Sequence, residues 1–304
     1  RELVQSDTGV IRRLRGALIG RCIRWFGELR RQSVDNQGLY QRFFGRFGIF
    51  MKEGMCTTEL TDAQRDELAG LLLFRTTAAD QVLSLDDIAE SNKEGPIVYV
   101  EAGSVEAALR SPYVAAIRTR RGNDAPIVIA QEAVDDHVLR SLGAFRGRPI
   151  MSADQVVREL ESSGDSDKSK AANETAIALF TNILGPKRVS DVACTSIADM
   201  PHPAYVAEAG AVGLQRLMRL YGRAAEGEGN RRLDFPVTPP QRLVLNPRHP
   251  LIQAIMGVKD AEVQRLLVEQ VFDNAMLVAG LHDDPAQMVP RLTDLLERLT
   301  AGSQ

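Results

Sequence analysis

The sequence has few cysteines, few aromatic residues and no long apolar stretch. Its 304 residues include 3 Cys and 5% aromatic side chains, and no two Cys form a C-x-x-C pair. Such thiols do not support a zinc ribbon or a thioredoxin-like site and are typical of a reducing compartment. No apolar run approaches the roughly 20 residues of a membrane-spanning helix. The net charge of −3 argues against a nucleic-acid binder driven by bulk charge.

Catalytic and metal-binding motifs are also missing. The sequence contains no P-loop, no nucleophile elbow and no dinucleotide-binding glycine motif. The 4 His residues have no metal-ligand spacing, so we expect no metal site and no enzyme activity from this chain alone. The alternative is a small α/β enzyme that uses Asp135, Asp136 and His137 as acids and bases. Against it, two acids in the first turn of a helix are ordinary.

Hydrophobic periodicity predicts an α+β multidomain chain. Residues 1–80 read as a helical segment, with amphipathic helices near 8–31 and 37–54 and another from Asp62 to Phe74. Short β-branched runs alternate with helical stretches over 81–160, which predicts a small α/β lobe. The polar residues 161–174 read as a linker to a mixed α+β C-terminal domain over 175–304.

Within the C-terminal domain the pattern predicts a helix over 175–184, a strand, and a helix containing Tyr205–Tyr221. A second strand is expected over 241–246. Asn246 followed by Pro247 reads as a helix N-cap with proline at the first helical position. We therefore expect the next helix to begin there and to continue through Met256.

The last two helices, predicted over 260–281 and 284–300, have wide apolar stripes and a tight turn between them. A single hairpin at a chain end cannot cover such stripes, so two copies are expected to form a four-helix bundle. The alternative is that the pair packs on its own domain. The predicted dimer-interface residues are Leu267, Val271, Ala275, Val278, Met288, Leu292, Leu295 and Leu296.

Two further amphipathic segments are candidate binding surfaces. Residues 208–221 carry a stripe of large apolar side chains beside a glycine-rich loop, which favours an adaptable patch for apolar segments of a partner. The predicted patch consists of Leu214, Leu217, Met218, Leu220 and Tyr221. The arginine-rich segment 8–31 allows an alternative, a protein that acts at a membrane surface, which burial of Trp25 would remove.

In order along nearly the whole chain stand the segments RELVQ, LYQRFFGRFGIFMKEG, LLLFRTTAA and LVLNPRHPLIQ, and together they resemble the heat shock protein 90 chaperone family. The opening RELVQ resembles the family's S-R-E-x-L-Q loop without its Ser. LYQRFFGRFGIFMKEG and LLLFRTTAA resemble two middle-domain segments, and LVLNPRHPLIQ resembles a C-terminal strand and helix. The resemblance implies the C-terminal part of the middle domain and the whole C-terminal domain. The start at Arg1 rather than Met agrees with a processed chain or a fragment.

The resemblance also implies partners and cofactors. The full-length parent is expected to be a homodimeric ATPase chaperone that binds ATP with Mg²⁺ and unfolded clients, with no nucleic-acid or membrane partner. Arg1 and Gln5 take the positions that reach the γ-phosphate in the family, whereas this fragment is expected to hold no cofactor. FDNAMLVAGLHDDPAQMV resembles the mitochondrial branch, and the ending TAGSQ lacks the tail that docks tetratricopeptide co-chaperones. A bacterial member is the alternative.

Overall fold

The computed structural model describes most of the chain. The described residues are 9–32, 38–57, 59–78, 82–91, 95–122, 125–162, 170–195, 197, 200–207, 239–282 and 284–301. They form an α+β structure with two compact units, one spanning 1–108 with 124–151 and the other spanning 109–123 with 152–304. The predicted helical segment and most of the predicted α/β lobe therefore share the first unit.

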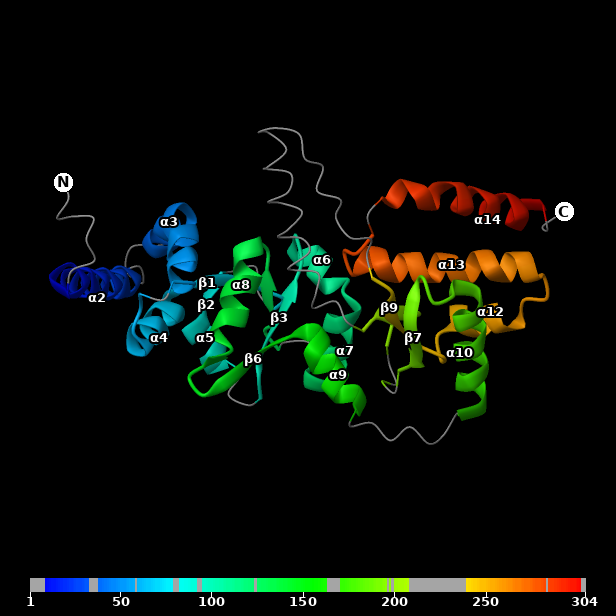
Figure 1. The fold of residues 1–304 in the computed structure, drawn as a ribbon, viewed down its shortest axis with the longest axis horizontal. Helices are drawn as coiled ribbons and strands as arrows, with labels where there is room; N and C mark the ends of the chain where they lie inside the picture. Colours follow the sequence, from blue (N-terminus) through cyan, green and yellow to red (C-terminus); the bar gives the residue numbers. More distant parts are fainter. Residues whose placement is uncertain are drawn as a thin grey trace. The chain divides into compact units, whose positions relative to one another are not determined.

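The first unit combines a helical layer with a mixed sheet (Figure 1). Its helices are α2 (Gly9–Gln32), α3 (Leu39–Met55), α4 (Asp62–Leu71), α5 (Leu85–Ser91), α6 (Val105–Leu109) and α8 (Ala133–Leu142). Its strands are β1 (Leu73–Thr76), β2 (Leu83–Ser84), β3 (Ile97–Glu101), β4 (Val128–Ala130), β5 (Ala144–Phe145) and β6 (Arg148–Ser152).

The strand order of this sheet is β2-β1-β4-β3-β6-β5. The β3–β4 pair is parallel, as predicted for a strand–helix–strand segment, whereas β1 pairs with β4 in antiparallel orientation. The helix predicted from Asp62 to Phe74 is too long. α4 ends at Leu71, and the buried residues after it form strand β1 of the sheet. Burial of Leu73 and Phe74 in the sheet outweighs the helical propensity of the Leu run.

The core of the first unit lies where α2, α3 and α4 meet the sheet. Tyr40 is almost fully buried, and its hydroxyl donates a hydrogen bond of 2.7 Å to the carbonyl oxygen of Leu71. Thr61 begins α4 with a capping box, because its hydroxyl accepts from the backbone N–H of Gln64 while the Gln64 side chain accepts from the Thr61 N–H. This cap agrees with the sequence prediction.

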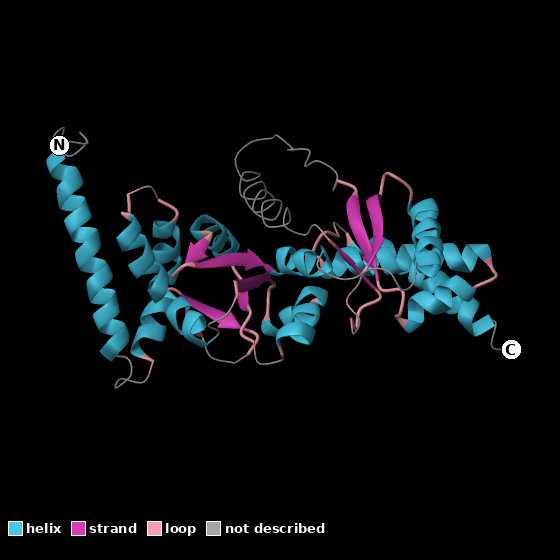
Figure 2. Ribbon diagram, turned by 90° about the horizontal axis from the view of Figure 1, so that it is seen from below, coloured by secondary structure: helices cyan, strands magenta, loops and turns pink. Residues whose placement is uncertain are grey.

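The second unit contains a three-stranded sheet flanked by helices (Figure 2). Its helices are α7 (Pro112–Arg121), α9 (Ala153–Ser162), α10 (Lys170–Leu184), α12 (Pro250–Gly257), α13 (Ala261–Val278), the 3₁₀ turn η2 (Pro285–Met288) and α14 (Val289–Ala301). Its strands are β7 (Val189–Cys194), β8 (Ala204–Val206) and β9 (Gln241–Leu245). The strand order β7-β9-β8 places β9 in the centre, parallel to β7 and antiparallel to β8.

The structure corrects three predictions for this region, namely the helix containing Tyr205, the linker over 161–174 and the start of α12. Tyr205 lies in strand β8, not in a helix, because it pairs with Val244 of the central strand. The helix α10 begins at Lys170, inside the predicted linker, because its first residues include the strong helix formers Ala171 and Ala172. α9 continues to Ser162, which shortens the predicted linker at its other end.

The third correction concerns the start of α12. Asn246 is not its N-cap, because its side chain makes other hydrogen bonds. The Asn246 amide donates a hydrogen bond of 2.7 Å to the carbonyl oxygen of Met200, and its Oδ1 accepts one of 3.1 Å from the Arg248 N–H. The cap is His249, whose Nδ1 accepts from the Leu251 N–H at 3.1 Å, and Pro250 then takes the first helical position. Proline therefore begins the helix as expected, but three residues later.

Candidate protein-interaction surfaces

The helices α13 and α14 form the hairpin that the sequence predicted. They lie side by side in Figure 1. Asp260 caps α13 by accepting from the N–H groups of Glu262 and Val263, and Asp284 caps η2 by accepting from the Ala286 N–H. Two complete caps fix where each helix begins, and the η2 turn leads directly into α14.

One face of this hairpin is apolar and has no partner within the described part of the chain. Its side chains retain between 39% and 62% of their full exposure, although all are large and apolar. The members of this exposed hairpin face are Leu277, Val278, Val289, Leu292 and Leu296. Several exposed large apolar residues on two adjacent helices are typical of a protein interface.

The residues predicted for the interface fall into two groups. Val278, Leu292 and Leu296 lie on the exposed hairpin face. Inside the second unit, by contrast, the structure buries Val271, Ala275, Met288 and Leu295. Leu267 is half-buried and packs against the same core. The buried members hold the hairpin together, and sequence periodicity alone did not separate the two groups because both belong to the same wide stripes.

Sequence reasoning missed Leu277 and Val289 on the exposed face and Arg291 between the two helices. The Arg291 guanidinium donates from Nη1 to Glu269 Oε2 at 3.2 Å, from Nε to Gln270 Oε1 at 3.2 Å, and from Nη2 to Asp273 Oδ2. The sequence does contain a signal for the role of Arg291. It lies three residues after Met288 and four before Leu295, which places it on their side of the helix.

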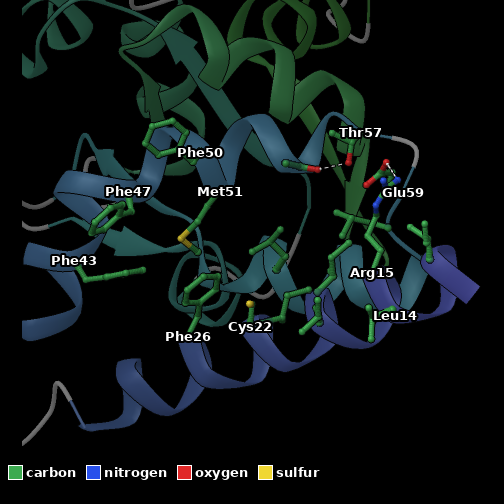
Figure 3. A pocket seen from close by; sticks show the side chains of 17 residues that line it. Leu14, Arg15, Cys22, Phe26, Phe43, Phe47, Phe50, Met51, Thr57 and Glu59 are labelled. Atoms are coloured by element: carbon green, nitrogen blue, oxygen red, sulfur yellow. Dashed lines mark hydrogen bonds and ion pairs between the residues drawn. The ribbon is translucent and has the colours of Figure 1, made fainter. Parts of the chain in front are cut away.

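The first unit carries a second apolar surface, a groove of about 780 Å³ between α2, α3 and α4. In Figure 3, Leu14, Cys22 and Phe26 on α2 lie across this groove from Phe47 and Met51 on α3. Arg15 and Glu59 form an ion pair of 2.6 Å at its edge. The lining is almost entirely apolar, so the groove suits an apolar segment rather than a polar metabolite.

The aromatic residues of α3 are only partly buried. Tyr40 is buried, Phe43 and Phe44 are half-buried, and Phe47 and Phe50 are exposed at the groove. Trp25 retains 51% exposure, in contact with the rings of Phe26 and Phe43. The burial that would remove the membrane-surface alternative is therefore not observed, and vesicle co-sedimentation remains its test.

The acidic pair considered for catalysis has structural partners. Asp135 Oδ1 lies 2.6 Å from Lys52 Nζ, and its other oxygen accepts from the backbone N–H groups of Gln131 and Glu132. Asp136 accepts two bonds from the Nε of Arg140, at 2.7 and 2.8 Å, and one from the Tyr99 hydroxyl. Both carboxylates are thus occupied by internal contacts, while His137 is exposed.

The surroundings of the cysteines agree with a structural role for their thiols. Burial raises the pKa of Cys194 to about 11 and also raises the pKa of Cys56, which keeps both thiols protonated near neutral pH. Cys22 is exposed beside the groove. Among the described residues, no three His, Cys, Asp or Glu side chains are grouped closely enough to bind a metal ion. A search of the described helices finds none suited to crossing a membrane.

Several predicted site residues lie outside the described residues. Arg1 and Gln5, the predicted γ-phosphate contacts, precede the first described residue. The predicted client patch, Leu214, Leu217, Met218, Leu220 and Tyr221, falls within residues 208–238, which are also not described. Their roles therefore stay predictions.

Two exposed apolar surfaces on one chain are typical of a protein that binds other proteins. Comparison with known sequences then identifies its family. A sequence profile described as Hsp90 protein matches residues 1–303. The chain therefore belongs to the Hsp90 family, as its motifs predicted.

The relatives come from mitochondria and from bacteria. The rat protein described as heat shock protein 75 kDa, mitochondrial, is 33% identical over 311 residues, covering 97% of this chain and 42% of the relative. Its bovine counterpart is 32% identical over the same length. The chaperone protein HtpG of Myxococcus xanthus is 28% identical over 317 residues, covering 99% of this chain and 45% of the relative. The chain spans less than half the length of these relatives.

Proposed function

We propose that this chain is the dimerising and client-binding part of an ATP-dependent chaperone. The observation that carries the proposal is the exposed hairpin face, Leu277, Val278, Val289, Leu292 and Leu296. A second copy related by a two-fold axis would place the same face against it and complete a four-helix bundle. Family membership supports a chaperone role, since the bacterial relatives are named chaperones.

Self-association is tested by removing apolar area from the exposed hairpin face. Leu296→Ser should leave the monomer folded, because this side chain is exposed in the protomer. A two-fold dimer carries the substitution twice and loses about 3 kcal/mol of association free energy in total. Its dissociation constant should therefore rise about 100-fold. Sedimentation velocity over a concentration series measures this change.

The matched control is Leu109→Ser, an exposed leucine at the end of helix α6 and outside the hairpin, which should leave the dissociation constant unchanged. An intact chain that sediments as a monomer at micromolar concentration would overturn the dimer proposal. If Leu296→Ser leaves the dissociation constant of the dimer unchanged, the interface must lie on another surface.

Client binding is proposed for the segment around Leu217 and Met218. The support is its sequence pattern, a run of large apolar residues followed by a glycine-rich stretch, together with the chaperone relatives. The double substitution Leu217→Ser with Met218→Ser should weaken suppression of aggregation of an unfolded model protein while the dimer persists. Unchanged suppression would remove this segment from the client surface.

We further propose that the full-length parent hydrolyses ATP and works in the mitochondrial matrix, with a bacterial cytoplasm as the alternative. The two mitochondrial relatives support the first location, and the HtpG relatives support the second. In the parent, Arg1 would supply a guanidinium to the γ-phosphate, where it would stabilise charge on the transferring group, and Gln5 would contact the same phosphate.

A further inference from the structure

The helix α14 has more apolar side chains than one packing face can hold. Met288, which leads into α14, and Leu295 are buried against the rest of the protomer, whereas Val289, Leu292 and Leu296 are exposed. Successive residues of an α-helix are about 100° apart, so a rotation of that size would exchange Leu296 for Leu295 at the α13 contact. The apolar pattern therefore does not decide which side of α14 faces α13.

Arg291 supplies the directional contact that decides it. Its three donors reach Glu269, Gln270 and Asp273, which lie at spacings of one and four residues on one side of α13. A guanidinium is planar and rigid, so it holds these acceptors only in a narrow range of orientations. The Arg291 side chain is only 13% exposed, and the side chains of Glu269 and Asp273 are similarly buried.

The acceptors are themselves held in place. Glu269 also pairs with Arg265 at 2.9 Å and with Arg188, just before β7, at 3.8 Å. Gln270 donates from its side-chain amide to Asn274 Oδ1 at 2.8 Å, which leaves its oxygen free to accept from Arg291. The acceptors therefore form a preorganised receptor for one arginine.

We propose that Arg291 is a positioning residue for self-association, which rests on the dimer proposed above. It fixes the rotation of α14 on α13, so that Leu292 and Leu296 face outward and stay available to a second copy. A partly buried ion network contributes little net stability compared with apolar packing, but it selects one arrangement among several of similar energy. Without it, α14 can turn its outward leucines toward its own α13.

The first test compares two arginines of the same helix. Arg291→Met keeps a long side chain and removes the three donors, and the dimer dissociation constant should rise by about tenfold or more. Arg298→Met is the matched control, because Arg298 is more exposed and its ion pair of 3.0 Å with Asp294 lies within α14 itself. It should leave the dissociation constant unchanged. Arg291→Lys keeps the positive charge but lacks the planar guanidinium with its several donors, so the dissociation constant should rise by an intermediate amount.

The second test measures the rotation itself, which a merely stabilising role would not change. In a Leu292→Ser background that keeps the chain monomeric, a single thiol is introduced as Leu295→Cys or as Leu296→Cys. Mass spectrometry then follows alkylation of that peptide apart from the native cysteines. Because Leu295 is buried and Leu296 is exposed, the thiol at 296 should react much faster. Adding Arg291→Met should bring the two rates together, with the circular dichroism spectrum unchanged.

Each outcome decides the proposal. Arg291→Met with an unchanged dissociation constant, or with unchanged relative labelling rates, would overturn the positioning role. If the unsubstituted chain is a monomer, the proposed dimer fails and with it the role in self-association. The labelling rates then still report whether Arg291 sets the rotation of α14, so the two failures are distinguishable.

Discussion

At the scale of single residues, His202 and His249 show how the fold changes the chemistry of ordinary side chains. Burial lowers the pKa of His202 below its usual value of 6.5, and the neighbouring His249 lowers it further. His249 uses its Nδ1 lone pair to cap α12, which requires that nitrogen to be unprotonated. The folded second unit therefore favours the neutral form of His202.

This preference predicts a pH dependence of stability. A histidine whose folded pKa is depressed binds fewer protons in the folded state than in the unfolded state, so stability is full above the unfolded pKa of about 6.5 and falls below it. Urea unfolding of the second unit at about pH 7.5 and about pH 5.5 should show this loss, and His202→Gln should reduce it. An identical pH dependence in that variant would contradict the assignment to His202.

At the scale of helices and strands, Lys52 connects α3 to α8. Its ammonium lies 2.6 Å from Asp135 and 3.3 Å from Glu132, and it also lies over the rings of Phe44 and Phe74. Lys52 and Asp135 are both buried, and each is an oppositely charged partner of the other. Such a pair fixes the contact between two helices whose sequences alone do not specify it.

The prediction at this scale is a large cost for breaking the pair. Lys52→Met leaves the Asp135 carboxylate buried without its partner and should destabilise the first unit by about 3 kcal/mol or more. Arg15→Met is the control, because the Arg15–Glu59 pair is half exposed and should contribute less than about 1 kcal/mol. Urea unfolding measures both, and equal losses would contradict the argument.

The elements also show what sequence patterns predict well and what they do not. Long amphipathic helices such as α2, α13 and α14 were predicted, because apolar residues that recur over 18 to 24 positions, as in α13 and α2, leave a clear signal. Short buried runs were ambiguous, since Leu73 and Phe74 fit a helix or a strand equally until their pairing partners are known. Tyr205 was misassigned for the same reason.

The candidate interface was predicted in outline but not in detail. The wide stripes of the last two helices indicated a hairpin with excess apolar surface. They did not tell which leucines face the protomer's own core, because Leu295 and Leu296 are adjacent in sequence and equally apolar. Arg291 resolves that choice through contacts with residues some 18 to 22 positions away, a pairing that no local periodicity reveals.

At the scale of the whole molecule, two compact units with separate cores should unfold differently. If the second unit dimerises, its melting temperature should rise with protein concentration, because association stabilises only the folded form. The first unit should melt at a temperature that does not depend on concentration. Differential scanning calorimetry over about a 100-fold concentration range tests this, and Leu296→Ser should abolish the dependence.

The strand order of the second unit has a consequence for folding during synthesis. Of the three described strands in this sheet, the central strand β9 is the last to leave the ribosome, and β7 and β8 each have it as their described partner. Neither earlier strand can form its ladder with β9 until residues 241–245 have emerged, about 50 residues after β7. A nascent chain of this length therefore holds two unpaired strand edges through much of its elongation, when it depends most on other proteins to prevent misassembly.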